Sequence, residues 1–191
     1  SKYVQSDMGD AIASVKRDLR AGREVLFSGT PCQVDGLLAF LNGPQDGLLT
    51  VDIICHGVPS QAFFADCMRE EFSDRLLSLR FRDKREGWGC GGGATVLRAG
   101  VKKDVPFSPE ISYYYRRFLV GDVYRESCYR CPYAGGERPG DFTIGDFWGI
   151  DVGGSGLDTR RGISVVIANT AKAEALIPCI KSETSWAERP L

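Results

Sequence analysis

The sequence predicts an α/β fold, with a mixed β-sheet that carries helices on its faces and has one loop-rich side. Two consecutive stretches each run from a short apolar strand through a tight loop into a helix with apolar residues at helical spacing, which indicates parallel strands with covering helices. A β-rich stretch follows in the middle of the chain. Because ligands of such folds bind outside the carboxyl ends of the parallel strands, the loops at those ends are candidate binding loops.

The first half of the chain contains the two strand–loop–helix stretches. A helix comes first, and the glycine that follows it is a plausible stop. The first strand then enters the loop SGTPCQ, and the second is followed by HGVPS, where Ser60 is a candidate N-cap. The expected elements are a helix over 10–20, a strand over 24–27, a helix over 34–41, a strand over 48–55 and a helix over 61–72.

The second half begins with strands and ends with one more strand and helix. Five glycines in the seven residues 87–93 predict a loop or a close backbone approach to a ligand. A helix should begin at Ser108, with Pro109 at its first position. The expected elements are a strand over 76–82, a hairpin of 94–97 with 101–105, a helix over 108–120, a strand within 138–151, a strand over 163–168 and a helix over 170–177.

Size and charge narrow the class of protein. The 191 residues, 43% of them hydrophobic, fit one domain with a substantial core. A net charge of -1 without a long run of either sign argues against a nucleic-acid partner. No apolar run approaches the roughly 18–20 residues of a membrane span, and the first residues lack a secretory signal profile. We expect a cytoplasmic protein, and the start without Met suggests a piece of a longer one.

Four cysteines in two settings are the most informative feature. Cys32 and Cys55 follow the first two predicted strands, and Cys128 and Cys131 form a CxxC pair. Such a pair places two thiolates on one turn, and two more thiolates from elsewhere complete a tetrahedral metal shell. The wide spacing matches neither a zinc finger nor a simple ferredoxin run, so the site depends on the fold gathering three loops. These residues therefore predict a dispersed metal or cluster site.

Other interpretations of the cysteines stay open at this point. A thioredoxin-like pair should open a helix after a strand, whereas Pro132 makes the CxxC stretch loop-like. Structural zinc remains a rival because four thiolates suit zinc as well as iron. Cys67, in an apolar helix, and Cys179, near the final helix, are expected to be buried bystanders, and the role of Cys90 in the glycine-rich stretch stays open. An odd total of seven cysteines argues against a disulfide scaffold.

Five motifs in order resemble a known family. SGTPCQVDGL, VDIICHGVPS, FRDKREGW, SCYRCPYA and RPGDFTIGDFWGI are similar to the carboxy-terminal region of the coenzyme F420 hydrogenase/dehydrogenase beta-subunit family, over about residues 1–150. The resemblance implies a flavoprotein with FAD beside a [4Fe-4S] cluster held by Cys32, Cys55, Cys128 and Cys131. It also implies that residues 1–191 are one FAD and iron–sulfur domain that lacks an upstream ferredoxin-like domain.

Several residues are candidates to contact the flavin or its phosphates. Backbone N–H groups at the start of a helix can bind phosphate, and a histidine can donate a hydrogen bond to a cluster sulfur or to flavin. Cations beside an aromatic ring can bind the phosphates of a dinucleotide, and an aspartate can accept a hydrogen bond from an N–H of the flavin ring. Each feature also has a purely structural explanation, namely a helix cap, a structural histidine, a solvated strand end and a turn in the core. The candidates are Ser28, Gly29, Thr30, Gln33, His56, Arg82, Lys84, Trp88, Gly145 and Asp146.

The resemblance leads to a functional expectation. The protein should be an oxidoreductase subunit that passes electrons between an iron–sulfur partner, such as a ferredoxin-like domain, and a small-molecule two-electron acceptor such as coenzyme F420. No catalytic side-chain acid or base is required. The competing expectations are a zinc-stabilised binding module and a relative that has lost its cofactors.

Overall fold

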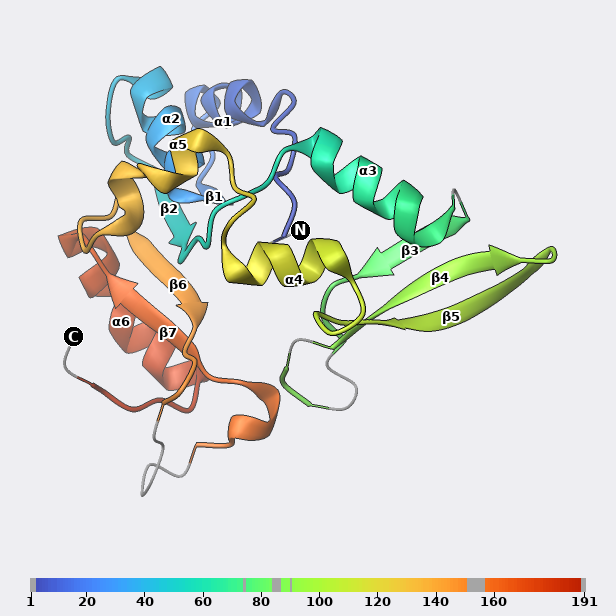
Figure 1. Ribbon diagram of the computed structural model, residues 1–191. Helices are drawn as coiled ribbons and strands as arrows, with labels where there is room; N and C mark the ends of the chain where they lie inside the picture. The colour runs from blue at the N-terminus through green and yellow to red at the C-terminus, as the bar shows by residue number, and fades with distance from the viewer. Residues whose placement is uncertain (1–2, 74, 84–86, 90, 151–156, 190–191) are drawn as a thin grey trace. The chain divides into compact units, whose positions relative to one another are not determined.

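The computed structural model describes residues 3–73, 75–83, 87–89, 91–150 and 157–189 (Figure 1). The chain forms two compact units, which are described separately. Unit 1 comprises Ser1–Ser6 and His56–Cys131, and unit 2 comprises Asp7–Cys55 and Pro132–Leu191. Among the described residues, no helix has the length and apolar character needed to cross a membrane. The α/β content and the mixed sheet confirm the predicted fold class.

Unit 2 contains the mixed sheet (Figure 1). Its strands lie in the order β1-β2-β6-β7, of which β1, β2 and β6 are parallel and β7 is antiparallel. Gly29 pairs with Asp52, and Ile53 pairs with Ile144. The carboxyl ends of β1, β2 and β6 therefore meet at one edge of the sheet, called the carboxyl edge below. The strands are β1 Val25–Gly29, β2 Leu48–Ile53, β6 Phe142–Asp146 and β7 Ser164–Ala168.

Helices α1 (Ala11–Arg20) and α2 (Pro31–Leu41) pack against β1, and α6 (Ala171–Glu183) packs against β7. The core beneath α1 and α2 consists of apolar side chains that the helical and strand periodicities had placed inward. A short 3-10 helix, η3 (Thr159–Arg161), precedes β7. α6 runs six residues past its expected end because Pro178 lies inside the helix instead of ending it. The core residues are Val15, Phe27, Val34, Leu37, Leu41 and Leu48.

Unit 1 combines, in its described residues, an antiparallel sheet in the order β3-β4-β5 with the helices α3, α4 and α5 (Figure 1). Its core is largely aromatic, and Phe81, Phe107, Tyr114 and Tyr115 are all buried in it. Ser60 caps α3 as predicted, since its Oγ accepts the Phe63 N–H at 3.1 Å. The elements are α3 Gln61–Phe72, β3 Leu76–Arg80, β4 Gly92–Arg98, β5 Val101–Phe107, α4 Tyr113–Val120 and α5 Glu126–Tyr129.

The expected loop over residues 87–93 was wrong at its end, because Gly92 and Gly93 belong to β4. A Cβ at Gly92 would lie 2.1 Å from the carbonyl oxygen of Arg80. Glycine is therefore required by the close approach of β4 to the end of β3. This contact explains the presence of glycine at position 92, and no bound ligand is needed to explain it.

The predicted start of the helix at Ser108 was also wrong. Residues 108–111 form a separate turn, and α4 begins at Tyr113 with Ser112 as its N-cap. Ser112 Oγ accepts the Tyr115 N–H at 3.1 Å, and Glu71 on α3 accepts from Ser112 Oγ and from the Tyr114 N–H. A side chain 41 residues away thus completes the cap, which local sequence signals do not reveal.

Asp141 links β2, β6 and α6 in unit 2. Its carboxylate accepts from the Thr50 N–H at 2.8 Å, the Thr50 hydroxyl at 2.9 Å and the Thr170 hydroxyl at 2.8 Å, and Lys172 Nζ lies 3.0 Å away. Burial acts to raise the pKa of Asp141, but these hydrogen bonds outweigh burial and hold the pKa below its usual value. The ionised carboxylate therefore stabilises the folded unit.

Replacing Asp141 with asparagine is expected to lower the free energy of unfolding by about 1.5–3 kcal/mol at pH 7, because charged hydrogen bonds are lost. Because the pKa of Asp141 is lower in the folded protein, its ionised carboxylate stabilises the fold above the unfolded-state pKa of about 3.9. This stabilisation is lost as the pH falls through the folded-state pKa of Asp141. Urea unfolding at pH 7 and pH 3 should show the difference between the variants shrinking in acid. The exposed Asp46→Asn change is the control and should have little effect at either pH. A pH-independent loss in Asp141→Asn would contradict the assignment.

Candidate functional site

Cys32 and Cys55 lie at the carboxyl edge of unit 2. Cys32 lies in the first turn of α2, directly after β1, and Cys55 follows the end of β2 by two residues. Because Gly29 pairs with Asp52, each cysteine comes three residues after a paired position in two neighbouring parallel strands. Both thiols are exposed. The fold thus presents two exposed thiols at neighbouring strand ends, one in the first turn of α2 and one after β2, as the strand assignments predicted.

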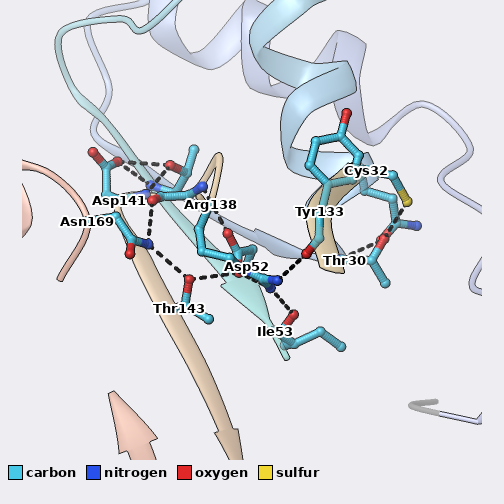
Figure 2. A network of polar contacts seen from close by, with 12 residues as sticks. Thr30, Cys32, Asp52, Ile53, Tyr133, Arg138, Asp141, Thr143 and Asn169 are labelled. Carbon is cyan, nitrogen blue, oxygen red and sulfur yellow. Dashed lines mark hydrogen bonds and ion pairs between the residues drawn. The ribbon is translucent and has the colours of Figure 1, made fainter. Parts of the chain in front are cut away.

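The residues on either side of Cys32 have structural contacts within unit 2. Ser28 and Gly29 belong to β1, so the strand extends two residues further than expected. The Thr30 N–H donates to Gln33 Oε1 at 2.9 Å, as in a helix cap, and the Thr30 hydroxyl lies 3.1 Å from Cys32 Sγ (Figure 2). Helix capping therefore explains Thr30 and Gln33 locally, while the hydroxyl is placed to donate to a Cys32 thiolate.

Cys128 and Cys131 lie at the end of unit 1. Cys128 is inside the four-residue helix α5, where its N–H donates to the Arg125 carbonyl at 2.8 Å, and the 3-10 helix η2 (Pro132–Ala134) follows Cys131. The stretch is thus two short helical turns instead of the irregular loop that was expected. Both thiols are half-buried. They lie three residues apart, the spacing at which a CxxC pair binds one metal or cluster.

Within the described residues, no group of three or more His, Cys, Asp or Glu side chains surrounds a common position for a metal ion. The donor chemistry of the four cysteines nevertheless fits a metal centre, since the described thiols include an exposed pair at the carboxyl edge and a CxxC pair. Thiolates are the ligands of both iron–sulfur clusters and structural zinc.

Two further cysteines lie in helices, Cys67 as expected and Cys179 because α6 runs past its expected end, but neither is fully buried. Cys67 on α3 is half-buried, and its partial burial together with the nearby Glu71 and Asp66 raises the pKa of its thiol. Cys179 on α6 is exposed, so the expected burial was wrong for this residue. The reason is that position 179 faces solvent in α6, whereas Ala173 is on the buried side of this helix.

The other candidate residues of unit 1 have structural contacts. The His56 ring lies 5.2 Å from Phe118 and 5.5 Å from Tyr124 between centroids, and the partial burial lowers the pKa of His56. Arg82 Nε donates to the Gly89 carbonyl at 3.2 Å, next to the half-buried Trp88. Lys84 and Cys90 lie outside the described residues.

Gly145 and Asp146 end β6 at the carboxyl edge of unit 2. Gly145 pairs with Val165, and Asp146 pairs with Ser164. A Cβ at Gly145 would lie 2.8 Å from Ile54 Cδ1, so packing beside β2 by itself explains why glycine is present there. Of the ten candidate cofactor residues, Ser28, Gly29, Thr30, Gln33, Gly145 and Asp146 belong to unit 2, and His56, Arg82, Lys84 and Trp88 belong to unit 1.

A buried ion pair that was not predicted from the sequence lies behind the carboxyl edge (Figure 2). The Asp52 side chain is 0% exposed and that of Arg138 is 9% exposed, with Arg138 Nη2 2.7 Å from Asp52 Oδ1. The Gly140 N–H and the Thr143 hydroxyl also donate to the Asp52 carboxylate, each at 2.9 Å. The signal that could have revealed it was an aspartate inside the apolar run LLTVDIIC, since a buried carboxylate needs a cationic partner.

The fold and the cysteines define an α/β protein with thiols at the carboxyl edge of a mixed sheet and a CxxC pair in a second unit. Residues 22–190 match the family described as the C terminus of the beta subunit of coenzyme F420 hydrogenase/dehydrogenase, and the chain belongs to this family. The family name places the chain among oxidoreductase subunits. The match confirms the resemblance seen in the motifs and extends it beyond residue 150. A comparison with curated proteins gives no significant match.

Proposed function

We propose that this chain is the part of an oxidoreductase subunit that holds a [4Fe-4S] cluster on Cys32, Cys55, Cys128 and Cys131, with FAD beside it. The observation that carries the proposal is the pair of exposed thiols, of Cys32 and Cys55, at the carboxyl edge of the sheet in a chain of this family. Ligands of open α/β sheets bind at this kind of edge.

Two of the four proposed ligands lie next to the boundaries between the units along the chain. Cys55 is the last residue before the chain passes from unit 2 to unit 1, and Cys131 is the last before it returns. One cysteine of each proposed pair is therefore at a covalent junction of the two units.

The residues of the chain would bind and tune the cofactors. When bound, the cluster supplies single-electron transfer and FAD supplies hydride-level transfer. The Thr30 hydroxyl, 3.1 Å from Cys32 Sγ, would donate to the thiolate and lower the electron density on that sulfur. We propose that FAD is contacted by the ten candidate residues, which are Ser28, Gly29, Thr30, Gln33, His56, Arg82, Lys84, Trp88, Gly145 and Asp146.

The partners proposed for this protein follow from the same chemistry. A ferredoxin-like domain or another iron–sulfur protein would exchange single electrons with the cluster. A small molecule that takes up two electrons, such as coenzyme F420 or a related carrier, would react with the flavin. The cytoplasm, where thiols remain reduced, suits a protein with free cysteines.

Anaerobic reconstitution of the full chain with iron and sulfide tests the cluster. We expect about four iron and four sulfide per chain, with a broad absorption at about 400 nm that dithionite bleaches. Addition of FAD to the reconstituted protein should then quench flavin fluorescence. A colourless protein that binds one zinc per chain and takes up no iron would overturn the redox proposal in favour of the zinc-stabilised module.

A further inference from the structure

A surface cavity of about 360 Å³ in unit 1 lies along helix α3 at the start of α4, two helices that pack against each other (Figure 1). Its volume falls within the range of about 300–1,000 Å³ that is typical of ligand sites. The lining residues are not among the candidate ligands of the cluster or of FAD. They are Phe63, Asp66, Cys67, Glu70, Glu71 and Tyr113.

Two aromatic rings supply most of the apolar wall of this cavity. The ring centroids of Phe63 and Tyr113 lie 6.5 Å apart, and Tyr113 is 54% exposed. The faces of such rings attract cations. The Arg117 guanidinium, which forms an ion pair with Asp122, already lies 5.9 Å from the centroid of the Tyr113 ring. This contact within the chain shows the kind of group that the Tyr113 ring accepts.

Three carboxylates come from the side of α3 that lines the cavity, since they are spaced by one helical turn. Asp66 is compensated by Arg69, whose Nη1 lies 2.9 Å from Asp66 Oδ1. Neither Glu70 nor Glu71 forms an ion pair with a described residue, and the two donors that Glu71 accepts from are neutral. The cavity therefore has two carboxylates without a compensating cation in the described part of the chain.

The Cys67 thiol in the wall gives an independent indication of the negative potential. Its pKa is raised, first by burial and then by the charges of Glu71 and Asp66. A thiol held in its neutral form adds no charge of its own. The cavity consequently favours a cation with an apolar or flat body, and it disfavours the anionic phosphates of a dinucleotide.

We propose that this cavity binds an arginine side chain presented by a partner protein. A guanidinium is planar, so it can stack on the aromatic rings while it donates to Glu70 and Glu71, whereas an ammonium group is a compact point charge. Glu70 and Tyr113 are exposed, so a side chain of another protein can reach them. The chain belongs to a family of enzyme subunits, for which a partner protein is expected. The inference goes beyond the proposed function and does not depend on the cluster or on FAD.

An NMR titration of the full chain, labelled with ¹⁵N and free of metal, tests the site. The probe is N-acetyl-arginine methylamide, which carries the cation but no carboxylate. We expect shift changes confined to the backbone amides of residues 63–71 and 113–117, with a dissociation constant on the order of 1 mM. The citrulline analogue, in which a neutral urea replaces the guanidinium, should bind about 10-fold more weakly or not at all. The lysine analogue should bind several-fold more weakly than the arginine analogue, because it lacks the planar fork.

Two variants test the contacts, and both change exposed residues. Glu70→Gln should raise the dissociation constant of the arginine analogue by about 2–5-fold through the loss of one charge. Tyr113→Leu should raise it by about 2–5-fold through the loss of the ring, whereas Tyr113→Phe keeps the ring and should bind normally. Glu24→Gln removes an exposed carboxylate of unit 2 and should change nothing. The amide spectrum of each variant shows directly whether it is folded.

Three outcomes would overturn the proposal. Equal binding of the arginine and citrulline analogues would show that the cavity does not recognise the charge. Unchanged binding in both Glu70→Gln and Tyr113→Leu would place the probe elsewhere. Tighter binding of free L-arginine than of its blocked analogue would indicate a metabolite site, because a carboxylate next to two glutamates should weaken binding. Iron uptake decides the cluster separately, since the titration uses the metal-free chain.

Discussion

Replacing Arg138 with methionine is expected to lower the free energy of unfolding by about 3–5 kcal/mol, the largest loss of stability that we predict. The change leaves the Asp52 carboxylate 0% exposed and without its cation, while the Gly140 N–H and the Thr143 hydroxyl still donate to it. Two peptide carbonyls, of Ile53 and Tyr133, also lose the donor that Arg138 provides. Urea unfolding followed by circular dichroism measures the loss.

The control for this change is Arg160→Met, also in unit 2. Arg160 pairs with Asp158 on the surface, where its side chain is 87% exposed, so its replacement should change the free energy of unfolding by no more than about 0.5 kcal/mol. Adding Asp52→Leu to Arg138→Met should recover part of the loss, because the unpaired buried charge is removed. A loss below about 1 kcal/mol in Arg138→Met alone would show that the ion pair does not stabilise unit 2 as described.

Replacing Cys128 with serine is expected to abolish iron uptake on reconstitution. A serine hydroxyl stays protonated at neutral pH and is a poor replacement for a cluster thiolate, so one ligand of the proposed four is lost. Iron and sulfide analysis after desalting, together with the absorption at about 400 nm, measures the effect. Cys32→Ser and Cys55→Ser should behave in the same way if the two cysteine pairs bind one cluster.

Cys179 provides the matched control for the cysteine series. Its thiol is exposed and it lies within α6, away from the proposed ligands in the sequence. Cys179→Ser should keep full iron content. Equal iron loss in Cys179→Ser and Cys128→Ser, or full iron content in Cys128→Ser, would refute the assignment of the ligands.

Some elements of the fold were predicted correctly because they depend on interactions between residues close together in the sequence. The apolar strand over β2 and the hydroxyl of Ser60 next to a helical pattern were recognised and confirmed. The start of α4 was misplaced because its cap is completed by Glu71, which is remote along the chain. Gly92 was assigned to a loop because the carbonyl that crowds it, from Arg80, is brought close by the pairing of β3 with β4.

For the candidate site too, features with a local sequence signal were predicted and features that depend on distant residues were missed. Two of its four cysteines were placed correctly at strand ends, since the carboxyl ends of neighbouring parallel strands lie at one edge. Asp52 and Arg138 were missed as a pair because 86 positions separate them in the sequence. The hydrogen bond from the Tyr133 hydroxyl to Asp35 on α2 spans 98 positions and has no local signal at all.

The sequence by itself determined the α/β class, the cysteines worth testing and, through five ordered motifs, the family that the match over residues 22–190 confirms. These properties depend on residue type and on spacing within a single strand, turn or helix. Only the tertiary structure decided that the Arg138 guanidinium binds the Ile53 and Tyr133 carbonyls, and that the Tyr133 hydroxyl donates to α2. Such contacts join residues that folding alone brings together, because a hydrogen bond depends on position in space and not on separation along the chain.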